Sequence, residues 1–504
     1  MQVTPPTPTA SNVTIDGTLT AKAFTDIVIH GSTACIAPAT LESVRRCHEA
    51  SQQITRNHTV YGRSTGVGAN KTTAATLDEK EQGISLLRSH CVDAGEPYTR
   101  KETRAMLTIR LNQLCNPGSG IDPDILTSLV SLINSDSLPT VRRFGSVGTA
   151  DLTALAGTAL AMAGERPLFD RNGNETSMEH PTLFTSQSAL PFISSSAMTL
   201  GETLLSCMQV RRSLAAETVA YALIMMVERG NLSPLSVSGA QAVAVSTAKT
   251  EADKVTALLH GCLWKPRNVQ DAYALRAWLP MHANTMRALQ RLEDQSFAIA
   301  NTAQENPLFL SETLDVVHHG AFMQAALAHE IAGVALAIAQ EATLLLARIT
   351  DLNDPRYTDL PKFLAPEQAG TSGTMIVEYV AASAEGEIFA AANPICSHTA
   401  VLSNGLEEDA TFATGEAERF RRSADALETM VACELLVALR AARMEGLDAG
   451  LPDDCPLRQL FTLTSKMNAS TEDRDLRNDL DALRDLLDDI ANIVDQKSPA
   501  TPQE

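Results

Sequence analysis

Several short segments of this chain combine side chains that could transfer protons or bind an acid with glycines or helix starts that would hold them in place. The first is Tyr61-Gly62-Arg63-Ser64-Thr65-Gly66-Val67-Gly68. Its three glycines predict a tight backbone that approaches another group closely. A tyrosine at the entrance of such a loop is either packed in the core or functional, and tyrosine is one of the side chains that can act as a general acid or base.

Three further segments carry charged or ring-bearing side chains, and each also has a purely structural interpretation. Arg276 ends Val269-Gln270-Asp271-Ala272-Tyr273-Ala274-Leu275-Arg276, where it could form a salt bridge at the start of a helix. Glu407, Glu408 and Asp409 are consecutive acids, which the helix dipole favours at a helix N-terminus. His90 ends Leu86-Leu87-Arg88-Ser89-His90 and is a lone histidine, a type that is often structural.

The most informative segment is Gly145-Ser146-Val147-Gly148-Thr149-Ala150-Asp151-Leu152. It resembles the signature loop of the aromatic amino acid ammonia-lyases (the histidine, phenylalanine and tyrosine lyases), which reads Gly-Ser-Val-Gly-Ala-Ser-Gly-Asp-Leu. The Tyr61 loop is similar to the family's Tyr-Gly-x-x-Thr-Gly-Phe-Gly, and 269–276 to its Val-Gln-Asp-x-Tyr-Ser-Leu-Arg. Asn301-Thr302-Ala303-Gln304-Glu305-Asn306-Pro307-Leu308 resembles its Asn-Ser-x-x-Asp-Asn-Pro-Leu. The resemblance implies the family's fold: mainly α, a long-helix bundle of the fumarase–aspartase type.

By this resemblance, each matched residue takes the role of its counterpart in the family. Tyr61 becomes the catalytic base, and its pKa, about 10 when unperturbed, must be lowered by cationic neighbours or a helix end. Arg276 binds the substrate carboxylate through a bidentate pair, and His90 recognises the substrate ring. Glu408, in a segment similar to the family's Gln-Glu-Asp-His, is the acid at the pocket. The other residues that the resemblance places in the site are Tyr273, Gln270, Asn306, Ser194 and Met323.

The departures from the family pattern cluster around one group. In the family, Ala-Ser-Gly cyclises into the electrophilic prosthetic group methylidene-imidazolone. Here only Thr149 and Ala150 separate Gly148 from Asp151, so the loop is one residue shorter and lacks the serine. We therefore predict that the chain has no methylidene-imidazolone, and we expect no other cofactor and no metal. The remaining departures are Ser194-Ser195-Ser196 for Asn-Gly-Thr, His318-His319-Gly320-Ala321-Phe322-Met323 for Gly-Gly-Asn-Phe-His, Glu305 for Asp, Glu407 for Gln and Ala410 for His.

Loss of the electrophile with retention of the other groups predicts a changed reaction. The leading hypothesis is a carbon–nitrogen lyase that abstracts a β-proton from a small aromatic or imidazole-bearing amino acid or its betaine. A trimethylammonium group cannot lose a proton to the base, and aromatic rings or a carboxylate can hold such a cation. The ergothionases, which resemble histidine lyase, follow this logic. The alternatives are an isomerase, cyclase or conjugate-addition enzyme on the same scaffold, an ordinary ammonia-lyase of weak activity, and a non-catalytic homologue with a binding role.

The elements that must position these residues are mostly helices. Aromatic residues make up only 4% of the chain, and its alanine- and leucine-rich composition favours helix over sheet. β-Branched alternation predicts a small hairpin within 13–35, and 470–490 reads as an amphipathic surface helix. Helical spacing predicts further helices at 41–55 and 81–87, and long apolar ones at 199–229, 286–302, 321–351 and 415–444.

A helix that is apolar on every side must be buried on every side. The three longest would each span about 45 Å, which is difficult to bury within one chain. Together with the resemblance, this predicts a homotetramer whose active sites are shared between subunits. The expected organisation is a disordered tail at 1–12, an active-site domain at 13–200, a helical bundle at 201–465, a helical segment at 466–496 and a disordered tail at 497–504.

Composition narrows the partners and the location. The net charge is −20 and no basic stripe offsets it, which argues against nucleic acid as a partner. Nine cysteines without short spacings are typical of free thiols in a reducing compartment, without a structural zinc site. No signal peptide is visible, and the longest apolar run, 331–340, is too short to span a membrane. We expect a cytoplasmic protein that binds a small molecule and no membrane.

Overall fold

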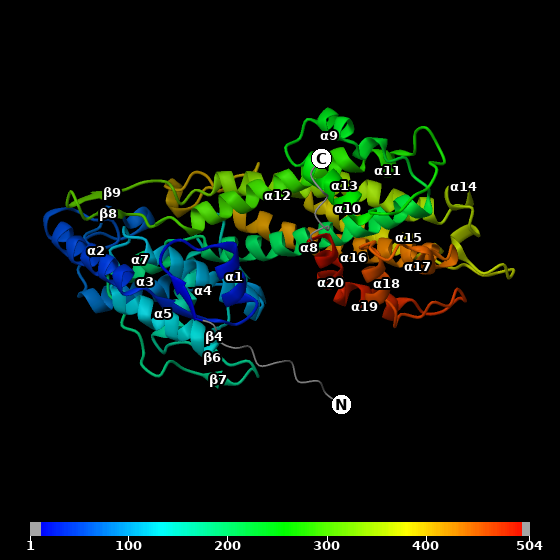
Figure 1. Cartoon of the computed structure of the whole chain (residues 1–504). Helices are drawn as coiled ribbons and strands as arrows, with labels where there is room; N and C mark the ends of the chain where they lie inside the picture. The colour runs from blue at the N-terminus through cyan, green and yellow to red at the C-terminus, as the bar shows by residue number, and fades with distance from the viewer. Residues whose placement is uncertain (1–11, 496–504) are drawn as a thin grey trace. The chain divides into compact units, whose positions relative to one another are not determined.

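The computed structural model describes residues 12–495, most of which are helical (Figure 1). The predicted mainly α fold is therefore confirmed. The helices, with η for 3-10 helices, are α1 Ala21–Val28, α2 Pro38–Asn57, η1 Gly68–Asn70, α3 Glu79–His90, α4 Arg100–Cys115, α5 Pro123–Ser135, α6 Leu152–Met162, α7 Ala189–Ile193, α8 Ala197–Val227, η2 Ser233–Leu235, α9 Val237–Val243, α10 Ala248–Leu258, α11 Tyr273–Arg276, α12 Trp278–Ala300, α13 Ala325–Leu352, α14 Pro355–Thr358, η3 Lys362–Leu364, α15 Met375–Ala391, η4 Ser403–Gly405, α16 Ala413–Met444, α17 Leu447–Gly450, α18 Arg458–Leu463, α19 Arg477–Asp485 and α20 Leu487–Asp495.

The strands are short and form small, separate sheets. β1 pairs with β2, β3 with β5, β4 with β6 and β6 with β7, and β8 with β9. Their bounds are β1 Asn12–Ile15, β2 Thr33–Ile36, β3 Ala94–Pro97, β4 Leu138–Pro139, β5 Arg142–Phe144, β6 Leu168–Phe169, β7 Glu175–Thr176, β8 Leu308–Leu310 and β9 Asp315–Val317.

The chain divides into two compact units, and neither is continuous in sequence. The first comprises 1–205, 293–331 and 394–418, and the second comprises 206–292, 332–393 and 419–504. Four of the five boundaries fall inside α8, α12, α13 and α16, and the fifth, between 393 and 394, follows α15. The expected boundary near residue 200 lies close to the first of them. The predicted disordered tails, 1–12 and 497–504, lie outside the described residues, apart from Asn12, which begins β1.

The predicted N-terminal hairpin is wrong. β1 pairs with β2 in parallel, with Ile15 opposite Ile36, and parallel strands need a crossover rather than a tight turn. That crossover is α1, which begins where the Thr20 hydroxyl accepts the Ala23 amide at 3.2 Å. Ile27, taken from the sequence as a strand residue, is buried on α1, because the apolar residues of this stretch recur at helical rather than alternate spacing.

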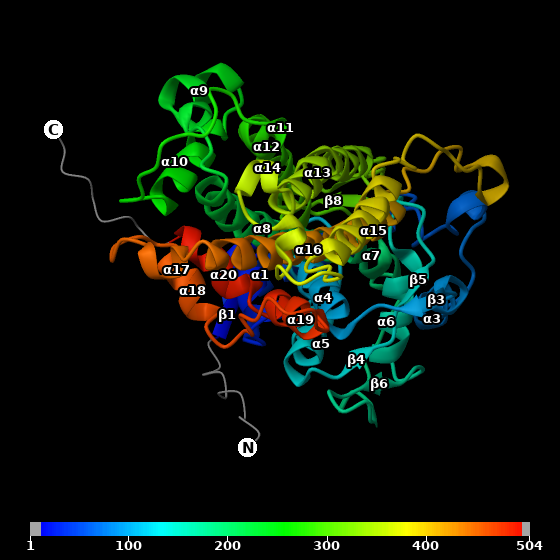
Figure 2. The same cartoon turned by 90° about the vertical axis from the view of Figure 1, so that its right-hand side faces the viewer.

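Helices of the first unit hold the segments that the sequence singled out. α4 is buried along almost its whole length and begins at a capping box between Thr99 and Glu102. α3, α6 and α7 pack against one another (Figure 2). α6 begins directly after the 145–151 loop, and α7 ends at Ile193, just before the three serines. The core of this unit therefore positions both the 145–151 loop, called the altered loop because it departs from the family pattern, and the three serines 194–196.

In the second unit, stretches of α8, α12, α13 and α16 lie side by side (Figure 1). The four long helices predicted from the sequence are confirmed, although α12 begins eight residues earlier than expected, with Pro280 in its first turn, where proline is tolerated. The predicted surface helix at 470–490 divides into α19 and α20, with Leu483 and Leu487 buried.

α13 is not buried on every side within one chain. Its exposed positions include His329, Gly333, Leu336 and Gln340, which recur at helical spacing and form one stripe. Among the described residues, α13 is also the one helix long and apolar enough to cross a membrane, but half of its apolar window is buried in the protein. The core helices of soluble proteins pass the same test.

Candidate active site

The loop that precedes α6 is held against the residues that lead into α16. The Gly148 backbone has φ +88°, and a Cβ atom there would lie 2.3 Å from Thr411 Oγ1, so glycine is required. The Thr411 hydroxyl donates a hydrogen bond to the Gly148 carbonyl at 2.8 Å, and the Phe412 amide donates to the Val147 carbonyl at 2.8 Å. The loop is therefore positioned by both the main chain and a side chain of 411–412.

Asp151 ends this loop as a buried carboxylate anchored to the first turn of α8. Its oxygens accept hydrogen bonds from the Thr199 amide at 2.8 Å, the Thr199 hydroxyl at 3.0 Å and the Thr414 hydroxyl at 3.3 Å. Burial raises the pKa of the Asp151 carboxyl, and these hydrogen bonds only partly offset it. The group is held by neutral donors at the positive end of a helix dipole.

Hydrogen bonds connect Asp151 to segments that are far apart in the sequence. The Asp151 amide donates to the Ser195 carbonyl at 2.8 Å. The adjacent Ser194, also buried, accepts the Asn306 amide at its hydroxyl oxygen at 3.2 Å. The loop, the three serines and the Asn306 segment therefore form one connected region of the first unit.

The same set of contacts continues to the Tyr61 loop. The Asn306 side-chain oxygen accepts the His319 amide at 2.9 Å. Next to it, His318 Nε2 accepts the Tyr61 amide at 3.3 Å. The two histidines that replace the family's usual residues thus link Asn306 to Tyr61. In the sequence these histidines are visible only as departures from the family pattern. Their position shortly after the Asn306 segment was the one sign that they could belong to the site.

A buried ion pair orients the Asn306 segment. Arg110 donates to Glu305 at 2.8 Å, and both side chains are fully buried. Arg110 also donates to the Phe192 carbonyl at 2.9 Å, which ties the pair to α7. Burial raises the pKa of Glu305, and Arg110 opposes that shift. The replacement of aspartate by glutamate is accommodated because the longer side chain reaches this arginine.

The Tyr61 phenol lies within its own loop, where its oxygen accepts the Gly68 amide at 2.6 Å. Burial raises the pKa of Tyr61, the Gly68 amide lowers it, and Glu407 raises it again. The net direction is upward. The expected lowering by a cationic neighbourhood is therefore wrong for the single chain, because burial dominates the shift and the Glu407 carboxylate adds to it.

Glu407, not Glu408, is the acid that the structure brings to Tyr61. A Cβ atom on Gly68 would lie 3.8 Å from Glu407 Oε1, and the Ala69 amide donates to the Ser403 hydroxyl at 3.0 Å. Both acids are exposed, but Glu408 contacts Thr399 instead, since its carbonyl accepts the Thr399 hydroxyl at 3.5 Å. Adjacent residues of an extended segment point to opposite sides, so the sequence alone does not tell which of the two acids faces Tyr61.

A family model described as aromatic amino acid lyase matches residues 19–460. The chain belongs to the aromatic amino acid lyase family. It is 30% identical to the histidine ammonia-lyase of Geobacillus thermodenitrificans over 436 residues, which cover 83% of this chain and 86% of that protein.

Solved structures of this lyase family share the fold. The tyrosine aminomutase of Streptomyces globisporus matches with a TM-score of 0.90 at 21% identity, covering 98% of this chain and 100% of that one. The ergothionase of Treponema denticola, described as an ergothioneine-degrading enzyme, matches with a TM-score of 0.87 at 18% identity, covering 96% and 99%. The chain is therefore a lyase-family enzyme with the helical ammonia-lyase fold.

The residues of the altered loop do not fit the family's prosthetic group. Methylidene-imidazolone forms from Ala-Ser-Gly, whereas the serine present here, Ser146, is followed by Val147. The Ser146 hydroxyl is also engaged: it donates to the Ala150 carbonyl at 3.2 Å and accepts the Gly148 amide at 3.2 Å and the Thr414 hydroxyl at 2.8 Å.

Two other predicted residues of the first unit lie at the edges of the region. His90 is the last residue of α3 and half-buried, with Nδ1 2.8 Å from the Leu86 carbonyl, which leaves its other ring nitrogen available. Met323 is half-buried, and its amide donates to the Gly320 carbonyl at 3.0 Å in the segment that follows His319.

The remaining predicted residues lie in the second unit, at the start of α11. Gln270 is exposed, and Tyr273 is 67% exposed. The Arg276 guanidinium lies over the Tyr273 ring at 4.7 Å. Its Nε is buried and has no hydrogen-bond partner among the described residues. A buried donor without a partner is costly, so Arg276 is suited to receive an anionic group.

An arginine that the sequence analysis missed anchors the start of the altered loop. Arg143 in β5 binds Glu202 at 2.7 Å and Glu102 at 3.1 Å, and also pairs with Glu418. It lies over the Tyr98 ring at 4.4 Å. Burial and the nearby Glu418 raise the pKa of Glu202 to about 8. The four charged residues are distant in sequence, so only the fold reveals the cluster.

One group in the second unit has the composition of a metal site. The potential ligand atoms of Glu217, His282 and Glu341 lie within 4.8 Å of one another, and all three residues are buried. However, Arg348 donates to Glu217 and to Glu434. Burial lowers the pKa of His282, but Glu341 and its other carboxylate neighbours raise it more, to about 10. The ring is therefore a cation, and the group is charge-compensated by the protein itself.

Proposed function

We propose that this enzyme is a carbon–nitrogen lyase that works without methylidene-imidazolone. Its substrate would be a small carboxylate with an aromatic or imidazole ring, either an amino acid or its betaine. The observation that carries the proposal is the connected region from Asp151 through Ser194 and Asn306 to Tyr61, which links three of the predicted site residues to a loop that does not fit the group.

In the proposed reaction Tyr61 takes the β-proton, the Cα–N bond breaks, and the nitrogen leaves with the bonding pair as a carbon–carbon double bond forms. Arg276, with Gln270 and Tyr273 beside it, binds the carboxylate. His90 contacts the ring, and Asn306, Ser194 and Met323 line the site. Glu408 or the neighbouring Glu407 holds the positive nitrogen.

A betaine is the substrate type that best offsets the missing electrophile. The raised pKa of Tyr61 keeps its phenol protonated at neutral pH, and a nearby permanent cation favours the phenolate. A trimethylammonium group supplies that cation and cannot deprotonate. It leaves as a neutral amine, so the step needs no covalent activation. The fold shared with an ergothioneine-degrading enzyme supports the same substrate class.

A turnover screen tests the substrate class directly. Histidine, phenylalanine and tyrosine are each incubated with the enzyme beside their Nα-trimethylated betaines, and the products are read by mass spectrometry. We expect trimethylamine and an unsaturated acid from at least one betaine. Turnover of the free amino acids alone would contradict the betaine assignment. A protein mass lower by two waters would show that the prosthetic group forms after all.

Replacement of the base tests the mechanism. Tyr61→Phe should lower kcat by about 10²- to 10⁴-fold, the usual contribution of a general base, with little change in ligand binding. Tyr357→Phe is the matched control, because Tyr357 is in the second unit beside Arg356 and should leave kcat unchanged. Equal activity of Tyr61→Phe and wild type would exclude the proposed base.

The alternatives give distinct outcomes in the same screen. A product of unchanged mass would indicate an isomerase or cyclase. The fold shared with a tyrosine aminomutase is compatible with this alternative. A conjugate-addition enzyme would consume an unsaturated acid and an amine. Binding of the betaines without turnover over hours would indicate a non-catalytic homologue.

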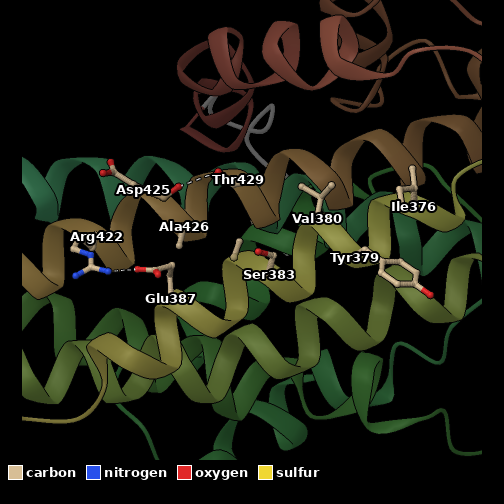
Figure 3. Close-up of a pocket in the computed structure, with 10 residues that line it drawn as sticks. Ile376, Tyr379, Val380, Ser383, Glu387, Arg422, Asp425, Ala426 and Thr429 are labelled. Atoms are coloured by element: carbon tan, nitrogen blue, oxygen red, sulfur yellow. Dashed lines mark hydrogen bonds and ion pairs between the residues drawn. The ribbon is translucent and has the colours of Figure 1, made fainter.

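We also propose the homotetramer with shared active sites. α15 exposes Ile376, Tyr379 and Phe389, and with α16 it borders a groove of about 630 Å³ (Figure 3). The Arg422–Glu387 pair, 2.5 Å apart, lies at one end of that groove. Apolar faces of this kind mark protein interfaces. Sedimentation should give four times the 53.9 kDa chain mass, and a stable monomer would overturn the assembly.

A cytoplasmic location belongs to the same proposal, and it rests on the nine cysteines, all of which are free thiols. Disulfide-free chains with many thiols are typical of reducing compartments. Cell fractionation would test it, and recovery of the enzyme outside the cytoplasm would contradict it.

A further inference from the structure

Two of the cysteines lie side by side in the second unit, outside the proposed site. The sulfurs of Cys262 and Cys455 are 3.4 Å apart, although the residues are 193 positions apart in the sequence. A disulfide bond is about 2.05 Å long, so a shift of little more than 1 Å would join them. Cys262 follows α10, and Cys455 precedes α18.

The two segments that carry these sulfurs are held together by neighbouring contacts. His260 Nε2 lies 3.2 Å from the Asp454 carboxylate. Between them, Gly261 has φ +74°, and a Cβ atom there would lie 3.2 Å from Pro452. Both the left-handed turn and the close approach favour glycine. Three consecutive residues, 260–262, thus face 452–455. The cysteine contact is one of several contacts that hold these two segments together.

The protonation of the pair suits thiol chemistry. A hydrogen bond from the Cys262 thiol, helped by the Leu457 amide, lowers the pKa of Cys455 to about 7 against the opposing effect of burial. The same hydrogen bond raises the pKa of Cys262. One sulfur is therefore partly a thiolate near neutral pH, which is the reactive form. Cys262 is partly exposed whereas Cys455 is buried directly behind it, so a small oxidant would reach the Cys455 sulfur from the Cys262 side.

We propose that Cys262 and Cys455 are a redox modification site that closes reversibly to a disulfide under hydrogen peroxide. The Cys455 thiolate, whose proton has passed to solvent, attacks one peroxide oxygen and gives a sulfenic acid; hydroxide leaves and takes up the Cys262 thiol proton as water. The Cys262 thiolate then attacks the sulfenic sulfur, and the departing hydroxide takes up a proton from solvent as the second water. Two thiols lose two electrons and two protons in total, and the peroxide is reduced to two waters. A dithiol reductant reverses the bond.

The test is peptide mapping of the full-length, reduced protein after titration with hydrogen peroxide. Without reduction, the peptides that contain Cys262 and Cys455 should appear joined, with the combined mass lower by two hydrogens. Dithiothreitol should separate them. The midpoint of thermal unfolding should also rise on oxidation, because the cross-link constrains the unfolded chain.

Serine variants of three cysteines test the proposal. Cys262→Ser should abolish the joined peptide and the thermal shift, whereas Cys396→Ser, a partly exposed cysteine in the first unit, should retain both. Cys455→Ser serves as the second test if Cys262→Ser folds poorly. Oxidation of both sulfurs to separate sulfinic acids, or full alkylation of both after peroxide treatment, would overturn the proposal.

Discussion

Two buried carboxylates, Asp151 in the first unit and Glu217 in the second, are held in opposite ways. Glu217 accepts the Trp278 Nε1–H at 2.8 and 3.0 Å, pairs with Arg348 and lies 3.4 Å from the His282 cation. Asp151 accepts hydrogen bonds from an amide and hydroxyls. Burial raises the pKa of both carboxyl groups. The partners, not the burial, distinguish them.

The difference shows what each region is built for. Buried charged side chains of helices α8, α12, α13 and α16 compensate one another, so removing any one of them costs free energy of folding. A carboxylate held by neutral donors can lose its charge without leaving an unpaired cation. The second unit is therefore organised around an ion network, and the altered loop around hydrogen bonds that tolerate change.

The largest effect is expected from the ion network. Arg348→Met should lower the free energy of unfolding by about 3–5 kcal/mol, because Glu217 and Glu434 lose their buried cation. Urea denaturation measures it. Arg287→Met, at an exposed position, should change stability by less than about 0.5 kcal/mol. Similar values for the two variants would remove the contrast between the regions.

Alkaline pH should weaken the same network. The pKa of His282 is raised to about 10 in the folded protein, above its unfolded value of about 6.5. Its stabilisation is thus complete below pH of about 6.5 and is lost as pH rises through about 10.

We expect a loss of about 3–4 kcal/mol in unfolding free energy between pH 7 and 10. His282→Gln should flatten most of this dependence, and urea titrations at each pH would show it. An equally steep dependence in His282→Gln would assign the effect to other groups.

The altered loop should be sensitive to shape. Gly148→Ala should cost about 2 kcal/mol, because φ +88° is strained for alanine and the new Cβ would meet Thr411 Oγ1 at 2.3 Å. Gly173→Ala is the matched control: its φ is +81°, but nothing lies within 4 Å, so only the backbone cost of about 1 kcal/mol applies. Thermal unfolding of the pair separates the two contributions. Equal costs would show that the loop can move away from residues 411–412.

The smallest effect is expected where charge alone is removed from the loop. Asp151→Asn should cost about 1 kcal/mol, because an amide can still accept the Thr199 amide hydrogen bond. Glu217→Gln should cost several times more, since it leaves Arg348 and His282 under-compensated. Chemical denaturation of both variants gives the ratio. A larger cost for Asp151→Asn would reverse the interpretation of the two regions.

Much of the fold could be predicted from the sequence, because long apolar helices are recorded in local composition. α8 and α16 lie within two residues of their predicted bounds. The N-terminal hairpin failed because Ile27 fits either an alternating or a helical pattern, and the parallel pairing that decides between them joins residues 21 positions apart. The roles of Arg276, His90 and Glu408 stay predictions, although the structure adds the unpaired Nε of Arg276.

By itself, the sequence determined that the altered loop has Thr149 and Ala150 where the family's Ala-Ser-Gly stands, since covalent chemistry depends on residue identity alone. It also placed the chain's motifs in the family's order. Only the tertiary structure decided that Glu407 rather than Glu408 lies beside Tyr61, that the pKa of this tyrosine is raised, and that Cys262 meets Cys455. Those properties depend on burial and on contacts between distant segments, which no local pattern encodes.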